Sequence, residues 1–315
     1  MIAQGTDGNH PDDEKWLSTV EGMRVYTAPE LEKYLLDAGF SSVKSFKKEN
    51  GTNIDKLKRH GYEIIGPVKG MLANGDTGDG KLPSEEELVD YIVRELAHEK
   101  DLAGKKILVT AGPTQEAIDP VRYISNHSTG KMGYAIAKCA MERGAEVVLV
   151  TGETSTSKPP FVKIVPVVSA KDMFEAVKEH CEDADFIIKA AAVADYTPMT
   201  TAEEKIKKQD GGFNLELKKT TDILKFLGEN RKEGQFLCGF SMETENMIEN
   251  SQAKLVKKNV DMIVANNLKT EGAGFGTDTN CVTLITKDKV TELAKMSKDE
   301  VASELLKAIQ EKRSI

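Results

Sequence analysis

The sequence feature that most constrains the fold is a repeated alternation, beginning at Lys105, between continuous apolar runs and runs with helical periodicity. The runs KKILVTA, AEVVLVTG and DFIIKAAA are apolar at nearly every position, which is typical of strands buried on both faces of a sheet. Strands that alternate with helices along a chain favour a parallel sheet covered by helices on both sides. We therefore expect an α/β fold with a doubly wound, Rossmann-like parallel sheet.

Helices are predicted where apolar residues recur at three- and four-residue spacing. The helix that follows Gly130 carries Met132, Ile136 and Ala140 on one face, and Gly144 is predicted to end it as a C-cap. The predicted helices span residues 85–96, 130–143, 170–183, 246–258 and 298–312. Further strands are predicted at residues 162–167, 235–239, 261–267 and 281–286.

The chain is expected to have three parts. The polar, charged stretch AHEKDLAG precedes the first strong strand, so we place a boundary there and assign residues 101–315 to the α/β domain. Before it lie an N-terminal segment of uncertain origin, residues 1–51, and a tail and linker, residues 52–100, which together make a small α/β segment. Inside the domain, residues 199–212 are polar, rich in lysine and end in Gly-Gly, which predicts a mobile, Lys-rich flap.

Charge and composition exclude several classes of function. The 315 residues carry a formal charge of −8 without a basic stripe, which argues against binding to nucleic acid. No apolar run approaches the roughly 20 residues that span a membrane. The acidic N-terminus lacks the features of a signal peptide, so the cytoplasm is the expected compartment. The cysteines are far apart and form no CxxC pair, which favours reduced thiols over zinc ligands or disulfides.

Ligands of an open parallel sheet bind beyond the carboxyl ends of the strands, so the segments there hold the candidate functional residues. The loop after the strand KKILVTA is long and delivers Gly130 to the start of a helix, where backbone N–H groups can face a phosphate. It has neither GxGxxG nor GxxxxGK[ST] spacing. Within it, Arg122 and Asn126 can donate to a phosphate or an acyl oxygen; the alternative is that they brace the loop.

Three later segments add candidates at or near strand ends. Asp195 can accept hydrogen bonds from a base or a ribose or help to hold Mg²⁺, although such residues are often turn caps. Lys205 and Lys207 belong to a run of three cations in four residues on the predicted flap, although a charge run is often only a solvated face. In GFSMETEN, Phe240 offers a stacking surface for a base, and the alternative for this segment is a helix capping box.

Taken together and in this order, these segments resemble the phosphopantothenoylcysteine synthetase domain of bacterial coenzyme A biosynthesis. The resemblance covers residues 101–315, and its most specific motifs are DPVRYISNHSTGKMG and KAAAVADYTP followed by EKIKK; LKKTTDIL, GFSMETEN and ANNLKTEGAGFGTDTN also match. It implies a two-step ligase. CTP would first activate the carboxylate of 4′-phosphopantothenate as an acyl cytidylate with release of pyrophosphate, and the amino group of cysteine would then displace CMP.

The same resemblance implies roles for the residues of the matching motifs. Asn126 would hold the acyl cytidylate and polarise its carbonyl, Arg122 would support phosphopantothenate or the phosphates, and Lys205 would close over the triphosphate. The family requires Mg²⁺, for which the sequence identifies no ligands, and commonly forms homodimers; the preference for CTP over ATP rests on the resemblance alone. The implied nucleotide-pocket residues are Gly112, Ser128, Gly130, Ala191, Asp195, Lys205, Lys207 and Phe240.

The first hundred residues resemble other enzymes only in part. Residues 60–93 look like the tail of the flavin-dependent decarboxylase to which such synthetases are often fused. Asn74 stands where the decarboxylase pattern has a cysteine, and an amide cannot supply a thiol proton, so neither decarboxylation nor bound FMN is expected. Residues 14–51 faintly resemble the end of a class I methyltransferase without its S-adenosylmethionine-binding half, so methyl transfer is not expected.

Two other functions fit parts of the sequence. The doubly wound pattern permits an NAD(P)-dependent oxidoreductase, which the missing GxGxxG and the weak acidic candidate Glu153 disfavour. The altered decarboxylase tail permits a catalytically inert nucleotide-binding module. Cysteine-dependent formation of CMP from CTP and phosphopantothenate would distinguish the ligase from both alternatives.

Overall fold

The computed structural model describes residues 64–71, 77–81, 83–208, 213–243, 245–267, 274 and 276–313. In this part of the chain, two compact units meet between Ile92 and Val93. The predictions for residues 1–51 and for Asn74 lie outside the described residues. None of the described helices is both long and apolar enough to cross a membrane.

The described part of the first unit is a short hairpin followed by the beginning of a helix. Strand β1 (Val68–Met71) pairs antiparallel with β2 (Thr77–Lys81), and helix α4 (Glu85–Leu96) runs on past the junction of the units. The helix begins where it does because Ser84 and Glu87 cap it reciprocally, each backbone N–H donating to the other side chain at 2.8 and 3.2 Å. The helix predicted at residues 85–96 is therefore confirmed.

An eight-stranded sheet forms the centre of the second unit. Its strands in spatial order are β15 (Val290–Glu292), β14 (Val282–Thr286), β12 (Met262–Asn267), β11 (Phe236–Glu243), β8 (Phe186–Lys189), β3 (Lys106–Ala111), β6 (Glu146–Thr151) and β7 (Lys163–Pro166). From β3 the chain winds first to β6 and β7 on one side and then to β8, β11 and β12 on the other, with all these strands parallel. This is the doubly wound order, so the predicted Rossmann-like fold is confirmed. Only the edge departs from it, because β14 and β15 pair antiparallel.

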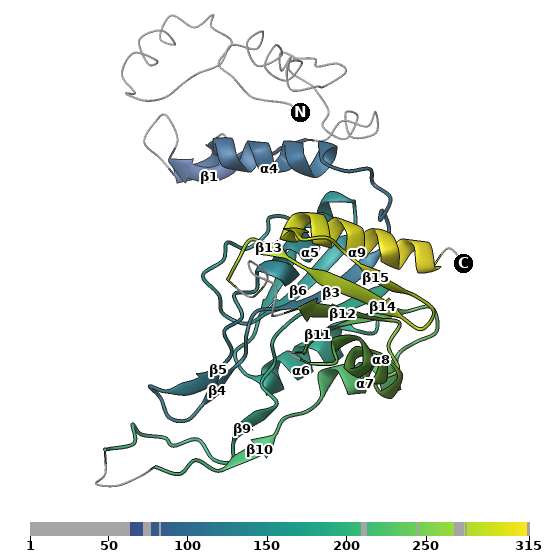
Figure 1. Cartoon of the computed structure of the whole chain (residues 1–315). Coiled ribbons are helices and arrows are strands. Elements are labelled where there is room, and N and C mark those ends of the chain that lie inside the picture. Colours follow the sequence, from purple (N-terminus) through teal and green to yellow (C-terminus); the bar gives the residue numbers. More distant parts are fainter. Residues whose placement is uncertain are drawn as a thin grey trace, which may run out of the picture. The chain divides into compact units, whose positions relative to one another are not determined.

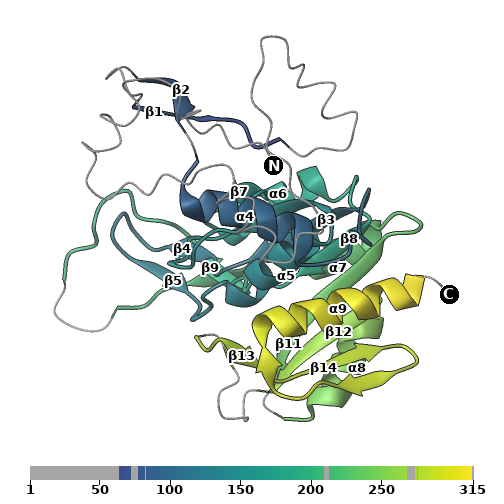
Figure 2. The ribbon, with the colours of Figure 1, turned by 90° about the horizontal axis from the view of Figure 1, so that it is seen from above.

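Helices cover both faces of this sheet (Figures 1 and 2). On one face lie α5 (Lys131–Glu142) and α9 (Lys298–Arg313). On the other lie α6 (Ala170–His180), α7 (Ile223–Asn230) and α8 (Met247–Lys257). The two-sided cover explains the sequence pattern, since β3 and β14 bury almost every side chain.

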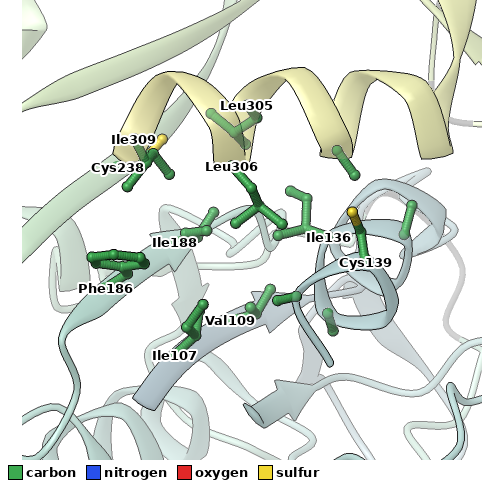
Figure 3. Packing of buried hydrophobic residues seen from close by; sticks show 14 of the residues in the cluster. Ile107, Val109, Ile136, Cys139, Phe186, Ile188, Cys238, Leu305, Leu306 and Ile309 are labelled. Carbon is green, nitrogen blue, oxygen red and sulfur yellow. The ribbon is translucent and has the colours of Figure 1, made fainter. Parts of the chain in front are cut away.

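The core under α9 is made of large aliphatic side chains. Leu305, Leu306 and Ile309 are fully buried and point toward α5 and the sheet, where Ile136 and Ile188 lie (Figure 3). Burial of one such side chain contributes about 1.5–3 kcal/mol. The last helix is therefore an integral part of the α/β unit.

The ends of the helices follow from local sequence. Gly144 ends α5 with a φ of 91°, and its backbone N–H donates to Met141 O at 2.9 Å, so the predicted C-cap is confirmed. Ser169 and Asp172 form a capping box at the start of α6. Asp222 caps α7, a helix that the sequence analysis did not predict, by accepting from the backbone N–H of Lys225.

The polar stretch before β3 is docked on the α/β unit. Arg143, at the end of α5, makes a two-pronged ion pair with Asp101, with distances of 2.9 and 2.6 Å. Lys100 Nζ donates to Glu142 O at 2.6 Å, and the side chain of Leu102 is fully buried. Residues 100–102 therefore belong to the packed unit, although their sequence is that of a connecting segment.

Small strands outside the main sheet were also not predicted. The strands β4 (Gln115–Ala117) and β5 (Tyr123–Ser125) form a hairpin after β3, and β9 (Tyr196–Pro198) pairs with β10 (Leu217–Lys219) after β8. Both pairs extend away from the sheet (Figure 1). We call residues 115–125, 196–208 and 213–219 the arm. A further pair joins β13 (Thr279–Asn280) to β16 (Met296–Ser297).

Candidate functional site

The candidate site lies where the strand order reverses, beyond the carboxyl ends of β3 and β8. The loops that leave these two strands run together: Pro113 forms a parallel bridge with Ala192, and Ala192 N donates to Gly112 O at 3.0 Å. Thr114 N in turn donates to Ala192 O at 3.3 Å. Two segments almost eighty residues apart in sequence therefore form one continuous rim.

The glycines predicted to line the nucleotide pocket hold special backbone positions on this rim. Gly112 has a φ of 73° and Gly130, immediately before α5, a φ of 76°. A Cβ atom on either would lie 3.0 Å from the side-chain methyl group of Thr154, so the backbone is closely packed here. Gly130 N donates weakly to Ser128 Oγ at 3.4 Å. Where this loop leads into α5, its backbone therefore lies beside the strand ends, and no bulky side chain separates them.

Asn126 lies beside the loop that follows β8. Its Nδ2 atom donates to Ala192 O at 2.8 Å, and its side chain remains exposed. The neighbouring Ser125 Oγ donates to Thr114 O at 2.8 Å, which fixes the end of β5 against the rim. The structure therefore brings Asn126 next to the backbone of the loop that follows β8.

Arg122 is engaged in an anchor between two parts of the arm. Asp119 is buried and accepts hydrogen bonds from the Arg122 side chain and from the backbone N–H of Ile206 at 3.1 Å. A second guanidinium N–H of Arg122 donates to Ile206 O at 2.9 Å. The Arg122 guanidinium, together with backbone N–H donors, holds the pKa of the Asp119 carboxyl well below its usual range. These hydrogen bonds of Arg122 are the ones that its alternative interpretation, bracing of the loop, predicts.

This anchor lies within residues 199–212, the segment predicted to be a Lys-rich flap. Lys205 and Lys207 flank Ile206, and both side chains are exposed. Upstream, Ala202 N donates to Ile118 O at 3.0 Å. Residues 199–208 therefore lie along the β4–β5 hairpin; residues 209–212 lie outside the described residues.

A cluster of lysines beside the rim was missed by the sequence analysis. Lys189, the last residue of β8, donates to Ala191 O at 3.1 Å, and Lys254 on α8 donates to Phe240 O at 3.3 Å. Lys258, directly after α8, forms an ion pair with Asp222, the N-cap of α7. Two signals were available: a lysine ends an otherwise apolar strand, and two lysines are four residues apart on one helix face.

Electrostatics couple the members of this cluster. Burial lowers the pKa of Lys189 to about 8; the ammonium group of Lys254 adds to the effect, while the carboxylates of Asp222 and Asp195 oppose it. Burial raises the pKa of Asp222, but hydrogen bonds from Lys258 and from a backbone N–H outweigh it and leave that pKa below its usual value. Electrostatic interactions among these side chains therefore contribute to the pKa shifts of Lys189 and Asp222.

The remaining predicted residues have different surroundings. Asp195 is exposed, and its carbonyl oxygen accepts from Thr220 N at 2.9 Å. Ala191 is buried, and its backbone N–H donates to Thr110 Oγ1 at 3.1 Å. The half-buried Phe240 ring packs against the core under α5 and α9, which is the face opposite α8.

Positive charge dominates this site. Within the described ranges, no group of three or more His, Cys, Asp or Glu side chains could hold a metal ion. All four cysteines are described as free thiols: Cys139 and Cys238 are buried, and Cys181 and Cys281 are half-buried. The site combines lysine side chains, an amide and closely packed backbone at a switch point of the sheet. This combination defines the class of protein, which is a doubly wound α/β domain suited to a phosphate-bearing ligand.

Comparison with known proteins identifies the family. The family described as DNA/pantothenate metabolism flavoprotein C-terminal domain matches residues 102–312. This is two thirds of the chain, and it contains every site residue described above. The chain belongs to this family.

Several relatives are similar over most of the chain. The coenzyme A biosynthesis bifunctional protein CoaBC of Bacillus subtilis is 49% identical over 90% of this chain and 69% of its own length. A cysteine/cysteine sulfinic acid decarboxylase of an unknown prokaryotic organism is 43% identical over 82% of this chain and 73% of its own length.

Solved structures are similar over most of the chain. The C-terminal domain of a CoaBC protein is 48% identical with a TM-score of 0.57, covering 66% of this chain and 95% of that domain. A Cab2 mutant in complex with phosphopantothenate-cysteine shares only the fold, with 17% identity, a TM-score of 0.55 and coverage of 73% of this chain and 94% of its own.

Proposed function

We propose that the chain is a phosphopantothenate–cysteine ligase that uses CTP in coenzyme A biosynthesis. One observation carries the proposal: at the switch point of the sheet the exposed amide of Asn126 lies against the loop that follows β8, and the Asp119–Arg122 anchor holds the lysine-bearing segment around Ile206 on the adjoining β4–β5 hairpin. A nucleotide triphosphate and a carboxylic acid can meet there. Membership of a pantothenate-metabolism family and the name of the Bacillus relative support the same function.

The proposed reaction has two steps, and each step forms one bond and breaks another. A carboxylate oxygen of 4′-phosphopantothenate attacks the α-phosphorus of CTP, a new P–O bond forms, and the bond to the β-phosphate breaks to release pyrophosphate. The amino nitrogen of cysteine then attacks the acyl carbon, a C–N bond forms with loss of a proton, and the C–O bond to CMP breaks. Both steps need oriented donors and cations around developing negative charge rather than a covalent intermediate on the protein.

The residues of the rim suit these requirements. The exposed amide of Asn126 can donate to the carbonyl oxygen of the acyl cytidylate. Lys205 and Lys207, beside Ile206, supply charge that can close over the triphosphate, and Lys254 and Lys258 border the same rim from α8. Arg122 contributes by holding the arm in place, with part of its guanidinium still exposed.

The backbone supplies the rest of the nucleotide pocket. In this proposal Gly112, Ser128 and Gly130 line the phosphate side, while Ala191 and Asp195 lie nearer the base and ribose. Phe240, whose half-buried ring packs under α5 and α9, is the proposed neighbour of the base. We assign Mg²⁺ to the substrate, as MgCTP, because Mg²⁺ is commonly held by phosphates with only one or two carboxylates.

A turnover assay tests the function. We expect CMP to form from CTP only when both phosphopantothenate and cysteine are present. An NAD(P)-dependent enzyme would instead reduce or oxidise its cofactor, and an inert module would bind CTP without releasing pyrophosphate. Replacing CTP by ATP tests the nucleotide preference. Absence of cysteine-dependent CMP in a folded sample that binds CTP would contradict the ligase.

Two variants separate the steps. Asn126→Asp is expected to bind CTP and release pyrophosphate but to accumulate acyl cytidylate, because a carboxylate cannot donate to the acyl oxygen. Lys205→Gln is expected to slow pyrophosphate release instead. An unchanged rate of product formation in the first variant, or of pyrophosphate release in the second, would remove that residue from the mechanism. Lys232→Gln, at an exposed ion pair with Glu182, is the matched control.

We also propose that two copies associate through the arm. It carries several exposed apolar side chains and lines an open pocket of about 280 Å³. The exposed residues are Val121, Tyr123, Tyr196, Met199, Phe213 and Leu217. Sedimentation equilibrium is expected to give a dimer that Phe213→Glu disrupts; a wild-type monomer at micromolar concentration would contradict the pairing.

The remaining proposals concern the first unit and the compartment. Neither decarboxylation nor FMN binding is proposed for this chain, since Asn74 stands where the decarboxylase pattern has a cysteine. A yellow purified protein with flavin absorption would contradict this. We propose that this ligase acts in the cytoplasm.

A further inference from the structure

The segment that directly follows β6, residues 152–156, packs against the glycine turns of the candidate site. Its central residue is the half-buried Thr154. The methyl group of Thr154 lies 3.0 Å from the position that a Cβ atom would take on Gly112, and it lies equally close to that position on Gly130. The two turns also contact each other, since a Cβ atom on Gly130 would lie 3.3 Å from Gly112 N. One methyl group therefore occupies the space beside both turns.

Hydrogen bonds fix the Thr154 side chain in this position. Thr154 Oγ1 donates to Tyr134 Oη at 3.2 Å, and Tyr134 Oη is in turn 3.0 Å from Thr151 Oγ1, on the last residue of β6. Tyr134 is buried and belongs to the first turn of α5. Two residues after Thr154, Thr156 Oγ1 donates to Thr129 O at 2.9 Å. The segment is thus bonded both to the chain just before α5 and to the first turn of that helix.

The start of α5 depends on such packing for its position. Gly130 is the N-cap, and among the residues that the structure describes no side chain caps this end of the helix, whereas Ser169 and Asp222 cap α6 and α7. A helix start without a capping side chain can offer its first backbone N–H groups to a phosphate. Those groups then lie where the packing around Gly130 places them, and the methyl group of Thr154 is the closest contact that a Cβ atom there would make.

Resting on the proposed function, we propose that Thr154 is a positioning residue of the nucleotide site. Its methyl group keeps the Gly112 and Gly130 turns, and with them the first backbone N–H groups of α5, at the positions that the phosphates of CTP require. Thr154 acts through these two turns and does not itself contact the phosphates. A site built from backbone cannot compensate for a displaced turn by a change of side-chain rotamer, so a shift of about 1 Å is enough to weaken binding.

Two variants separate the methyl group of Thr154 from its hydroxyl group. Thr154→Ser keeps the hydroxyl group and loses the methyl group, whereas Thr154→Val keeps a methyl group at this position and loses the hydrogen bond to Tyr134. In turnover assays of the full chain, Thr154→Ser is expected to raise the KM for CTP about fivefold, with kcat and the KM for cysteine within about twofold of wild type. Thr154→Val should keep the wild-type KM for CTP. Thr291→Ser, at a half-buried threonine of β15, is the matched control.

Calorimetric titration with MgCTP alone provides a second readout, and each result decides the proposal. A wild-type KM and affinity for CTP in Thr154→Ser would overturn the positioning role, even if thermal stability falls; equal losses in Thr154→Ser and Thr154→Val would overturn the assignment to the methyl group. If wild type binds MgCTP but forms no CMP, the ligase is contradicted, and the affinities of the two variants still decide the role of Thr154. No binding by wild type would overturn both. Removal of one half-buried methyl group is a small loss of packing, so Thr154→Ser is expected to fold.

Discussion

At the scale of single residues, Gly152 determines whether the two rim loops can lie together. It directly follows β6, and a Cβ atom there would lie only 1.8 Å from Pro113 O, a contact that backbone cannot accommodate without moving. Pro113 is the residue that bridges to Ala192. Gly152 lies outside the candidate motifs, and because it has no Cβ atom the Pro113 loop can take its place in the rim.

We predict that Gly152→Ala displaces the Pro113 loop and weakens CTP binding at least about tenfold, while costing about 1–3 kcal/mol of stability. Gly276→Ala is the matched control, because no atom lies within 4 Å of the position its Cβ would take. Calorimetry and urea denaturation of both variants measure the two effects. Wild-type affinity in Gly152→Ala would show that the loop tolerates displacement.

Asp119 is the second residue on which the rim depends, and its effect has a defined pH range. The Arg122 guanidinium keeps the pKa of this carboxyl far below its ordinary value of about 3.9. Because the folded pKa is depressed, its stabilising contribution is complete above the unfolded pKa. It is lost only as the pH falls through the folded pKa. The anchor should thus persist throughout mildly acidic solution.

We predict that hydrogen exchange at the Ile206 amide, corrected for intrinsic rates, stays protected from pH 7 to pH 5 in wild type. In Asp119→Asn the neutral side chain no longer pairs with Arg122, so this protection should fall at least about tenfold. Asp288→Asn, which changes an exposed carboxylate paired with Lys312, is the control. Undiminished protection in Asp119→Asn would mean that other contacts hold the segment.

At the scale of elements, α9 joins the end of the chain to the middle of the sheet. We predict that Leu306→Ala destabilises the α/β unit by about 2–5 kcal/mol, because the fully buried side chain packs between α5 and the sheet and leaves a cavity. Lys307→Ala, on the exposed side of the same helix, should cost less than about 0.5 kcal/mol. Urea denaturation measures both; equal midpoints would place α9 outside the cooperative core.

The elements that the sequence did not reveal are the short ones. Helix α7 spans only eight residues and contains Gly228, so its apolar periodicity is brief. The strands of the arm have three residues each, too few for an alternating pattern to be recognised. By contrast, the long strands and helices were predicted to within a few residues, because burial on both faces or on one helical stripe determines their composition.

At the scale of the whole molecule, the second unit contains a complete core. Every residue of its two hydrophobic clusters lies at or after Leu102, and the docked residues Lys100 and Asp101 close its surface. We predict that a fragment of residues 93–315 folds alone, with a melting temperature within about 4 °C of the full chain and unchanged CTP affinity. Thermal denaturation and calorimetry test this. Aggregation of the fragment would show that the first unit is required.

The sequence by itself determined the doubly wound fold, the position of most long elements and the segments that follow the strands, since these depend on local periodicity and burial. It could not show that Asp119 binds the segment around Ile206, or that Lys258 pairs with Asp222. Those contacts join residues 36 and 87 positions apart, and only packing of the chain decides which of many compatible polar side chains come within bonding distance.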